Sequence, residues 1–119
     1  MITYYLFAFA VLFSSCRPAS VITTVPTGFK QIFDGKTLHG WEGDSTYWRV
    51  ENGAITGETT AATLLKKNNS FLIWQGGTPE NFELKVLYKV STQGNSGINY
   101  RSEKITGEYA LKGYQADLD

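Results

Sequence analysis

The sequence predicts an all-β fold, a sandwich of two antiparallel sheets. From Gly28 onward, short strand-like segments alternate with turns, and no apolar stretch at helical spacing is long enough to indicate a helix. The clearest segment, residues 82–90, has one unbroken apolar face made of Phe82, Leu84, Val86, Tyr88 and Val90. Strands that each carry one apolar face must bury it against a second sheet, which favours a sandwich.

The elements follow one another at short intervals. We expect a first strand at residues 29–33, a turn at residues 34–36, and two strands at 48–50 and 54–56. The last two should form a hairpin, because Asn52-Gly53 between them is a strong two-residue turn signal.

Two further strands precede the C-terminal part of the chain. The first covers residues 71–74 and is closed by Gly76-Gly77. The second is the 82–90 segment, whose other face carries Glu83, Lys85 and Lys89, so its sheet should be packed on one side only. In all, six or seven strands are visible, and we expect Trp41 and Trp48 to be buried among them.

Composition narrows the range of partners. The chain has 119 residues, eleven Lys plus Arg against eleven Asp plus Glu, and a formal net charge of zero. A protein that binds nucleic acid needs a basic stripe to neutralise phosphates, and the only adjacent basic pair is Lys66-Lys67. We therefore expect no nucleic-acid partner.

The N-terminus reads as an export signal. Residues 4–13 are apolar, too few to span a bilayer, and Ser14-Ser15-Cys16 follows them. This pattern resembles a lipoprotein signal, with lipidation at Cys16, the only cysteine; the other interpretation is a buried hydrophobic segment. We expect a signal peptide at 1–16, a tether at 17–27 and a domain at 28–119, exported to the periplasm or cell surface and held to the membrane by a lipid anchor alone.

The strongest functional signal lies near the C-terminus. In extended strands the side chains alternate between faces, so Asn99 and Arg101 should share one face, as should Gln115 and Asp117 and also Asp119. If these strands are neighbours, they form a patch of amides, a guanidinium and carboxylates. An ordinary sheet with its polar side in water would show the same alternation.

Such a patch is suited to a hydroxyl-rich ligand such as a sugar. Amides and carboxylates exchange hydrogen bonds with hydroxyls, and an arginine holds a carbonyl or anion in a fixed fork. The three Trp and seven Tyr residues could stack on a pyranose, although aromatic side chains are more often part of the core.

An ordered set of motifs covers nearly everything after the tether: GFKQIFDGKTLHGW at residues 28–41, YWRVENGAITGET at 47–59, FLIW at 71–74, NFEL at 81–84, NSGINYRS at 95–102 and GYQAD at 113–117. In this order and spacing the set resembles one family, the secreted bacterial 3-keto-disaccharide hydrolase or 3-keto-glucoside lyase and hydratase domain. The family domain continues past this last motif, so we expect the chain to be its N-terminal portion, truncated at the C-terminus.

The resemblance implies a concanavalin A-like jelly roll that acts on glycosides already oxidised to a ketone at carbon 3. The ketone acidifies the hydrogen on carbon 2, so a base can remove it. The glycosidic oxygen on carbon 1 then leaves by elimination, and water adds to the resulting 2-hydroxyglucal. Cleavage by this route needs no oxocarbenium ion.

The reaction needs a base near carbon 2, a group that holds the enolate oxygen and an acid for the leaving group. We expect Asp117 to be the base or a metal ligand, Arg101 to hold the enolate and Glu58 to be a second acidic candidate. The expected substrate-binding residues are Asn95, Asn99, Tyr100 and Gln115. The alternatives are a surface salt bridge between Arg101 and Asp117 and a simple turn contact for Asn95.

A cofactor is not required by the sequence. A divalent cation could polarise the ketone, but no ligand set demands one, and we expect His39, the only histidine, to be a surface residue. Two other functions stay open: a lectin-like carbohydrate-binding module on the same fold, and a purely structural lipoprotein.

Overall fold

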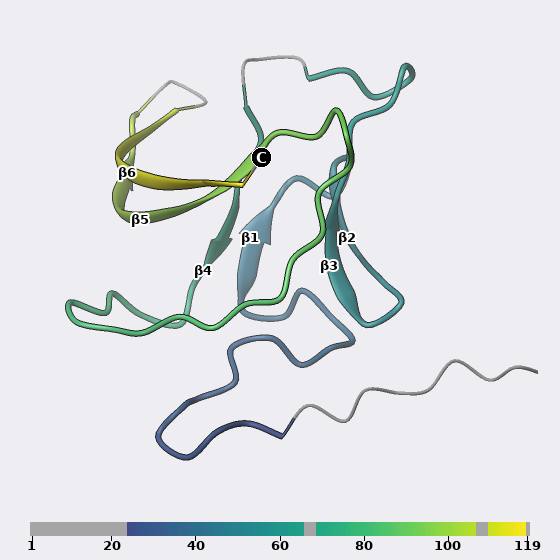
Figure 1. Cartoon of the computed structure of the whole chain (residues 1–119). Helices are drawn as coiled ribbons and strands as arrows, with labels where there is room; N and C mark the ends of the chain where they lie inside the picture. The colour runs from purple at the N-terminus through teal and green to yellow at the C-terminus, as the bar shows by residue number, and fades with distance from the viewer. Residues whose placement is uncertain (1–23, 66–68, 107–109, 119) are drawn as a thin grey trace, which may run out of the picture. The chain divides into compact units, whose positions relative to one another are not determined.

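The computed structural model describes residues 24–65, 69–106 and 110–118. The chain divides into two units, residues 1–30 and 31–119. In the described part of the first unit, the Phe29 N–H donates to the Pro26 carbonyl at 3.0 Å and closes a turn. All the strands found in the described residues belong to the second unit (Figure 1).

The second unit is built from three two-stranded antiparallel sheets. Strand β1 (Trp41–Gly43) pairs with β4 (Leu72–Trp74), β2 (Trp48–Glu51) with β3 (Ala54–Gly57), and β5 (Ser96–Lys104) with β6 (Leu111–Leu118). The described residues contain no helix, which confirms the all-β class. It follows that none of the segments described here is a helix long and apolar enough to cross a membrane.

The predicted hairpin is confirmed as β2 and β3. Glu51 pairs with Ala54 across a two-residue turn, in which Asn52 has φ 51° and Gly53 has φ 78°. Positive φ at both positions is what a type I′ turn requires, and this turn matches the twist of the flanking strands. The local sequence was therefore sufficient to define this hairpin.

The predicted strand at 71–74 is confirmed as β4, whereas its partner β1 was not predicted. Trp41 lies opposite Trp74 in the ladder, and the Gln75 N–H donates to the Gly40 carbonyl at 2.8 Å just beyond it. The Lys104 ammonium of β5 forms an ion pair with the Glu42 carboxylate of β1.

Two predicted strands are wrong. Residues 29–33 and 82–90 have no strand assignment, and Figure 1 shows the latter as a tube without an arrow. A strand requires a hydrogen-bonded neighbour, and alternation of side chains does not supply one. In the first of these segments, the Gln31 side chain instead donates to the Phe33 carbonyl at 2.6 Å.

Aromatic side chains form the best-packed part of the described chain. Tyr47 is 7% exposed, and its hydroxyl donates to the Leu64 carbonyl at 3.3 Å. Trp41 and Trp48 are half-buried rather than fully buried. The Trp48 indole N–H donates to the Ser70 hydroxyl at 2.9 Å, so its polar group has a partner.

The predicted turn at residues 34–36 is present and is held by one carboxylate. Asp34 Oδ1 accepts from the N–H groups of Lys36 and Thr37, each at 2.7 Å, and Oδ2 accepts from the Thr37 hydroxyl at 2.6 Å. These bonds, the Thr37 hydroxyl above all, lower the pKa of Asp34 to about 2, because they stabilise the ionised carboxylate.

Candidate functional site

The candidate site lies on the ribbon formed by β5 and β6. The two strands are neighbours, which is the condition for the expected polar patch, and Figure 1 shows them as a strongly curved pair. Ser96 lies opposite Leu118 at one end and Lys104 opposite Leu111 at the other. The ribbon is therefore formed by two consecutive strands of the chain.

Three predicted site residues form a hydrogen-bonded line across this ribbon, which we call the polar row: Asn99, Gln115 and Asp117. Asn99 lies directly opposite Gln115, and its Nδ2 donates to Gln115 Oε1 at 3.0 Å. Gln115 Nε2 in turn donates to Asp117 Oδ1 at 2.7 Å. The Gln115 amide thus orients the Asp117 carboxylate while that side chain remains exposed to solvent.

Gly97 is a part of the site that sequence reasoning missed. A Cβ atom at this position would lie 2.5 Å from Gln115 Nε2 and 2.6 Å from Cδ and Cγ of the same side chain. The Gln115 side chain therefore passes directly over a position where any other residue would displace it. The glycine was visible in the sequence, but only the register, with Gly97 opposite Asp117, gives it this role.

Arg101 does not continue the polar row. The register shifts between Tyr100 and Glu103, so β5 has one extra residue there, and Arg101 has φ 49°. A β-bulge interrupts the alternation of side chains, which the prediction that Arg101 shares a face with Asn99 did not take into account. The Arg101 guanidinium donates instead to the Glu80 carbonyl at 3.3 Å.

The bulge depends on a close approach of the two backbones. A Cβ atom on Gly113 would lie 2.6 Å from both the Arg101 carbonyl oxygen and the Ser102 Cα. Beside the bulge is an open hollow of about 280 Å³, lined by Glu80, Asn81, Phe82, Tyr100 and Arg101. Arg101 and Tyr100 therefore belong to this hollow, and Asn99, Gln115 and Asp117 to the polar row.

The predicted substrate-binding residue Tyr100 stacks on its cross-strand neighbour. The Tyr100 and Tyr114 ring centroids are 5.7 Å apart with an interplanar angle of 20°, and the residues are 39% and 63% exposed. Because they occupy the positions next to the Asn99–Gln115 pair, they lie on the other face of the ribbon. Asn95 is exposed and lies immediately before β5.

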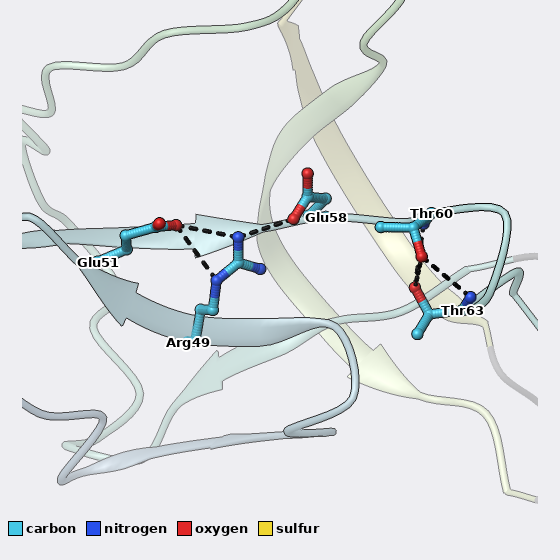
Figure 2. A network of polar contacts seen from close by, with 5 residues as sticks. All are labelled: Arg49, Glu51, Glu58, Thr60 and Thr63. Carbon is cyan, nitrogen blue, oxygen red and sulfur yellow. Dashed lines mark hydrogen bonds and ion pairs between the residues drawn. The ribbon is translucent and has the colours of Figure 1, made fainter.

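Glu58 belongs to a different cluster, on the β2–β3 hairpin. Figure 2 shows the Arg49 guanidinium between the carboxylates of Glu51 and Glu58, at 2.9 and 2.7 Å. The hydrogen bond that Arg49 donates to Glu58, together with the second carboxylate, raises the pKa of Arg49. The structure thus joins Glu58 to Arg49 rather than to the polar row.

The remaining candidates give no metal centre in the part of the chain that the structure describes. There, no three His, Cys, Asp or Glu side chains group closely enough to hold a metal ion. His39 is exposed, as expected for a surface residue. Cys16 and Asp119 lie outside the described residues.

Comparison with known proteins supplies a family. A model of the 3-keto-α-glucoside-1,2-lyase-like domain matches residues 28–119. A 3-keto-disaccharide hydrolase from Bacteroides thetaiotaomicron is 33% identical over 86 residues, which cover 68% of this chain and 30% of that protein. The matched region is therefore less than a third of that relative's length. No solved structure matches the chain.

Proposed function

Because this chain belongs to the family of 3-keto-α-glucoside-1,2-lyase-like domains, we propose that it forms part of an enzyme that cleaves the glycosidic bond of 3-keto-glycosides. The family and the name of the hydrolase relative support a carbohydrate substrate. The observation that carries the proposal within this chain is the polar row, in which a solvent-accessible carboxylate is oriented by an amide on a strand face.

In the proposed reaction, Asp117 takes the proton from carbon 2 of the keto sugar. The electron pair of that C–H bond passes into the enolate and then makes the bond between carbons 1 and 2 a double bond as the glycosidic oxygen leaves. The leaving oxygen takes up a proton, and water then adds a hydroxyl to carbon 1 and a proton to carbon 2. The products are the 3-keto sugar and the released alcohol, so atoms and protons balance.

The other proposed roles follow from what each side chain can donate. Gln115 donates a hydrogen bond to Asp117 Oδ1 and so fixes the orientation of the carboxylate. The other oxygen, Oδ2, would take the proton. Asn99 and Asn95 would bind sugar hydroxyls, and Arg101 would hold the enolate oxygen after leaving the Glu80 carbonyl. Tyr100 lies on the other face of the ribbon, so it is the less favoured of the expected substrate-binding residues. Glu58 would have to leave its ion pair with Arg49 to protonate a leaving group, so it is the less favoured acid.

We further propose that the strands belong to a concanavalin A-like jelly roll in which the curved β5–β6 ribbon contributes to the concave sheet. The all-β class and the antiparallel pairing support this architecture. Export, with lipidation at Cys16, remains a proposal from the sequence of residues 4–16. Metabolic labelling with a fatty acid tests it: the wild-type protein should be labelled, and Cys16→Ser should not.

The proposed activity is tested by turnover of a 3-keto-glucoside beside the unoxidised glucoside, with and without a chelator, using the whole natural reading frame. We expect only the keto sugar to be consumed, and sensitivity to the chelator would indicate a divalent cation. Asp117→Asn should abolish turnover while substrate affinity changes only a few fold. Glu103→Gln, which alters a carboxylate on the same ribbon outside the polar row, is the matched control and should retain activity.

A carbohydrate-binding module is the second candidate, and the exposed stack of Tyr100 on Tyr114 favours it. Exposed aromatic rings offer an apolar surface on which a pyranose can stack. A folded protein that consumes neither glycoside but binds one of them, with binding weakened by Tyr114→Ala, would support this function in place of the enzyme. A protein that neither binds nor turns over either glycoside would favour a structural role.

A further inference from the structure

Residues 82–90 present an apolar face to solvent. Phe82 is 50% exposed, Leu84 42%, Val86 56% and Tyr88 56%. These residues recur at every second position, as in a strand with one apolar face, yet the segment belongs to no strand among the residues that the structure describes. It therefore has the sequence of a strand without a neighbour, and such a segment is prone to pair with another chain.

The sequence of this segment is complementary to itself in one antiparallel register, the one centred on Val86. In that register two copies place Phe82 opposite Val90, Leu84 opposite Tyr88, and Val86 opposite Val86. Every apolar residue of the face then meets an apolar residue. Contacts of this kind between directly opposed side chains are what stabilise a pair of strands.

Charge favours the same register. On the other face, Glu83 of each copy lies opposite Lys89 of the other, which gives two cross-strand pairs of opposite charge. Within one chain Glu83 already lies 3.3 Å from Lys85, but both side chains are well exposed, so this ion pair leaves Glu83 accessible to a second lysine.

Neighbouring registers lose part of the apolar matches. A centre at Lys85 would place Val90 opposite Glu80 and Lys85 opposite its own copy, and a centre at Leu87 would place Phe82 opposite Thr92 and Lys85 opposite Lys89. Centres farther away, at Leu84 or Tyr88, leave two apolar residues of the face without an apolar partner. Registers that pair even-numbered with odd-numbered residues exchange the two faces. Only the register centred on Val86 satisfies the apolar and the charged positions together.

We propose that residues 82–90 are a self-association strand, through which two copies of this chain pair antiparallel about Val86. The proposal concerns assembly and does not depend on the proposed enzymatic activity.

The first test is sedimentation equilibrium of the full chain from about 1 to 500 μM. We expect a concentration-dependent dimer. Glu83→Lys and Lys89→Glu should each weaken dimerisation on the order of tenfold, because each change replaces two attractive pairs by two repulsive ones. The double variant Glu83→Lys/Lys89→Glu should restore it, since the pairs are then reversed but complementary. Lys85→Glu, opposite Leu87 in this register, is the matched control and should have a smaller effect.

Cross-linking provides a second readout that does not depend on the strength of the dimer. In a Cys16→Ser background, Val86→Cys should form an intermolecular disulfide under mild oxidation, because directly opposed Cβ atoms approach to about 4.5–5.5 Å. Leu87→Cys should cross-link far less, because Leu87 lies opposite Lys85. A chain that stays monomeric throughout the concentration range, a double variant that fails to recover, or equal cross-linking at both positions would each overturn the proposal.

Discussion

Gly97→Ala tests how the candidate site is positioned without altering any side chain of the polar row. The new methyl group would lie 2.5–2.6 Å from three atoms of the Gln115 side chain, whereas carbon atoms in contact lie about 3.5–4.0 Å apart. Gln115 must therefore move by about 1 Å. The hydrogen bonds of Gln115 to Asn99 and Asp117 are now 3.0 and 2.7 Å long. A displacement of this size would weaken or break both of them.

The expected loss follows from what these two bonds contribute. Two exposed hydrogen bonds of this kind stabilise the orientation of Asp117 by about 1 kcal/mol. This free energy corresponds to a change of about fivefold in an equilibrium constant or a rate constant. We therefore expect kcat for the 3-keto-glucoside to fall about fivefold and the Gln115 side-chain amide signals to shift in an NMR spectrum. The shift can be observed even in the absence of substrate.

A double-mutant cycle separates this effect from a general disturbance of the ribbon. If Gly97 acts through Gln115, then Gly97→Ala should add almost nothing in a Gln115→Ala background. Equal losses in both backgrounds, or unshifted Gln115 amide signals in Gly97→Ala, would refute the reasoning.

Two further predictions concern stability and pH. Gly113→Ala should lower the free energy of unfolding by about 1–3 kcal/mol, since its methyl group would meet backbone atoms that no rotamer change can move; denaturant unfolding measures this, and an unchanged midpoint would contradict the close approach. Thr37→Val should raise the pKa of Asp34 from about 2 toward its usual value of 3.8, because it removes the largest of the causes that lower it. Since the folded-state pKa of Asp34 is the lower one, the stability contributed by this turn is fully present above about pH 4 and is lost as the pH falls through about 2. An NMR titration of the Asp34 carboxyl would show both effects, and an identical titration in Thr37→Val would contradict the assignment.

The parts of the fold that the sequence predicted are those controlled by neighbouring residues. Asn52-Gly53 defined the β2–β3 hairpin because its turn chemistry is local, and period-two alternation was enough to place Asn99, Gln115 and Asp117 on one face. The polar row could be predicted because the strands run without interruption over those positions.

The parts that failed depend on contacts between distant segments. The pairing of β1 with β4 joins residues about thirty positions apart, and nothing in the local sequence of Trp41–Gly43 indicates the partner. The bulge at Arg101 requires the backbone of Gly113 to approach it, and a one-residue irregularity leaves no mark in the alternation of side chains. Residues 82–90 have the pattern of a strand, but a pattern of side chains does not specify a neighbour.

The bulge also constrains the proposed mechanism. Asp117 lies opposite Gly97, whereas Arg101 approaches Gly113, so the two positions are separated by four residues of β6, about 13 Å of extended chain. The proton on carbon 2 and the oxygen on carbon 3 belong to adjacent carbons of one sugar ring, so Asp117 and Arg101 can act on them together only if the guanidinium turns toward the polar row.

The hydrogen bond that Arg101 would give up, to the Glu80 carbonyl at 3.3 Å, is long and exposed. It stabilises the present position of the guanidinium by about 1 kcal/mol at most. A bound enolate could replace it with a charge-assisted bond, which is roughly twice as strong. The two proposed roles are therefore compatible only if substrate binding reorients Arg101, and this requirement distinguishes them from a preformed catalytic pair.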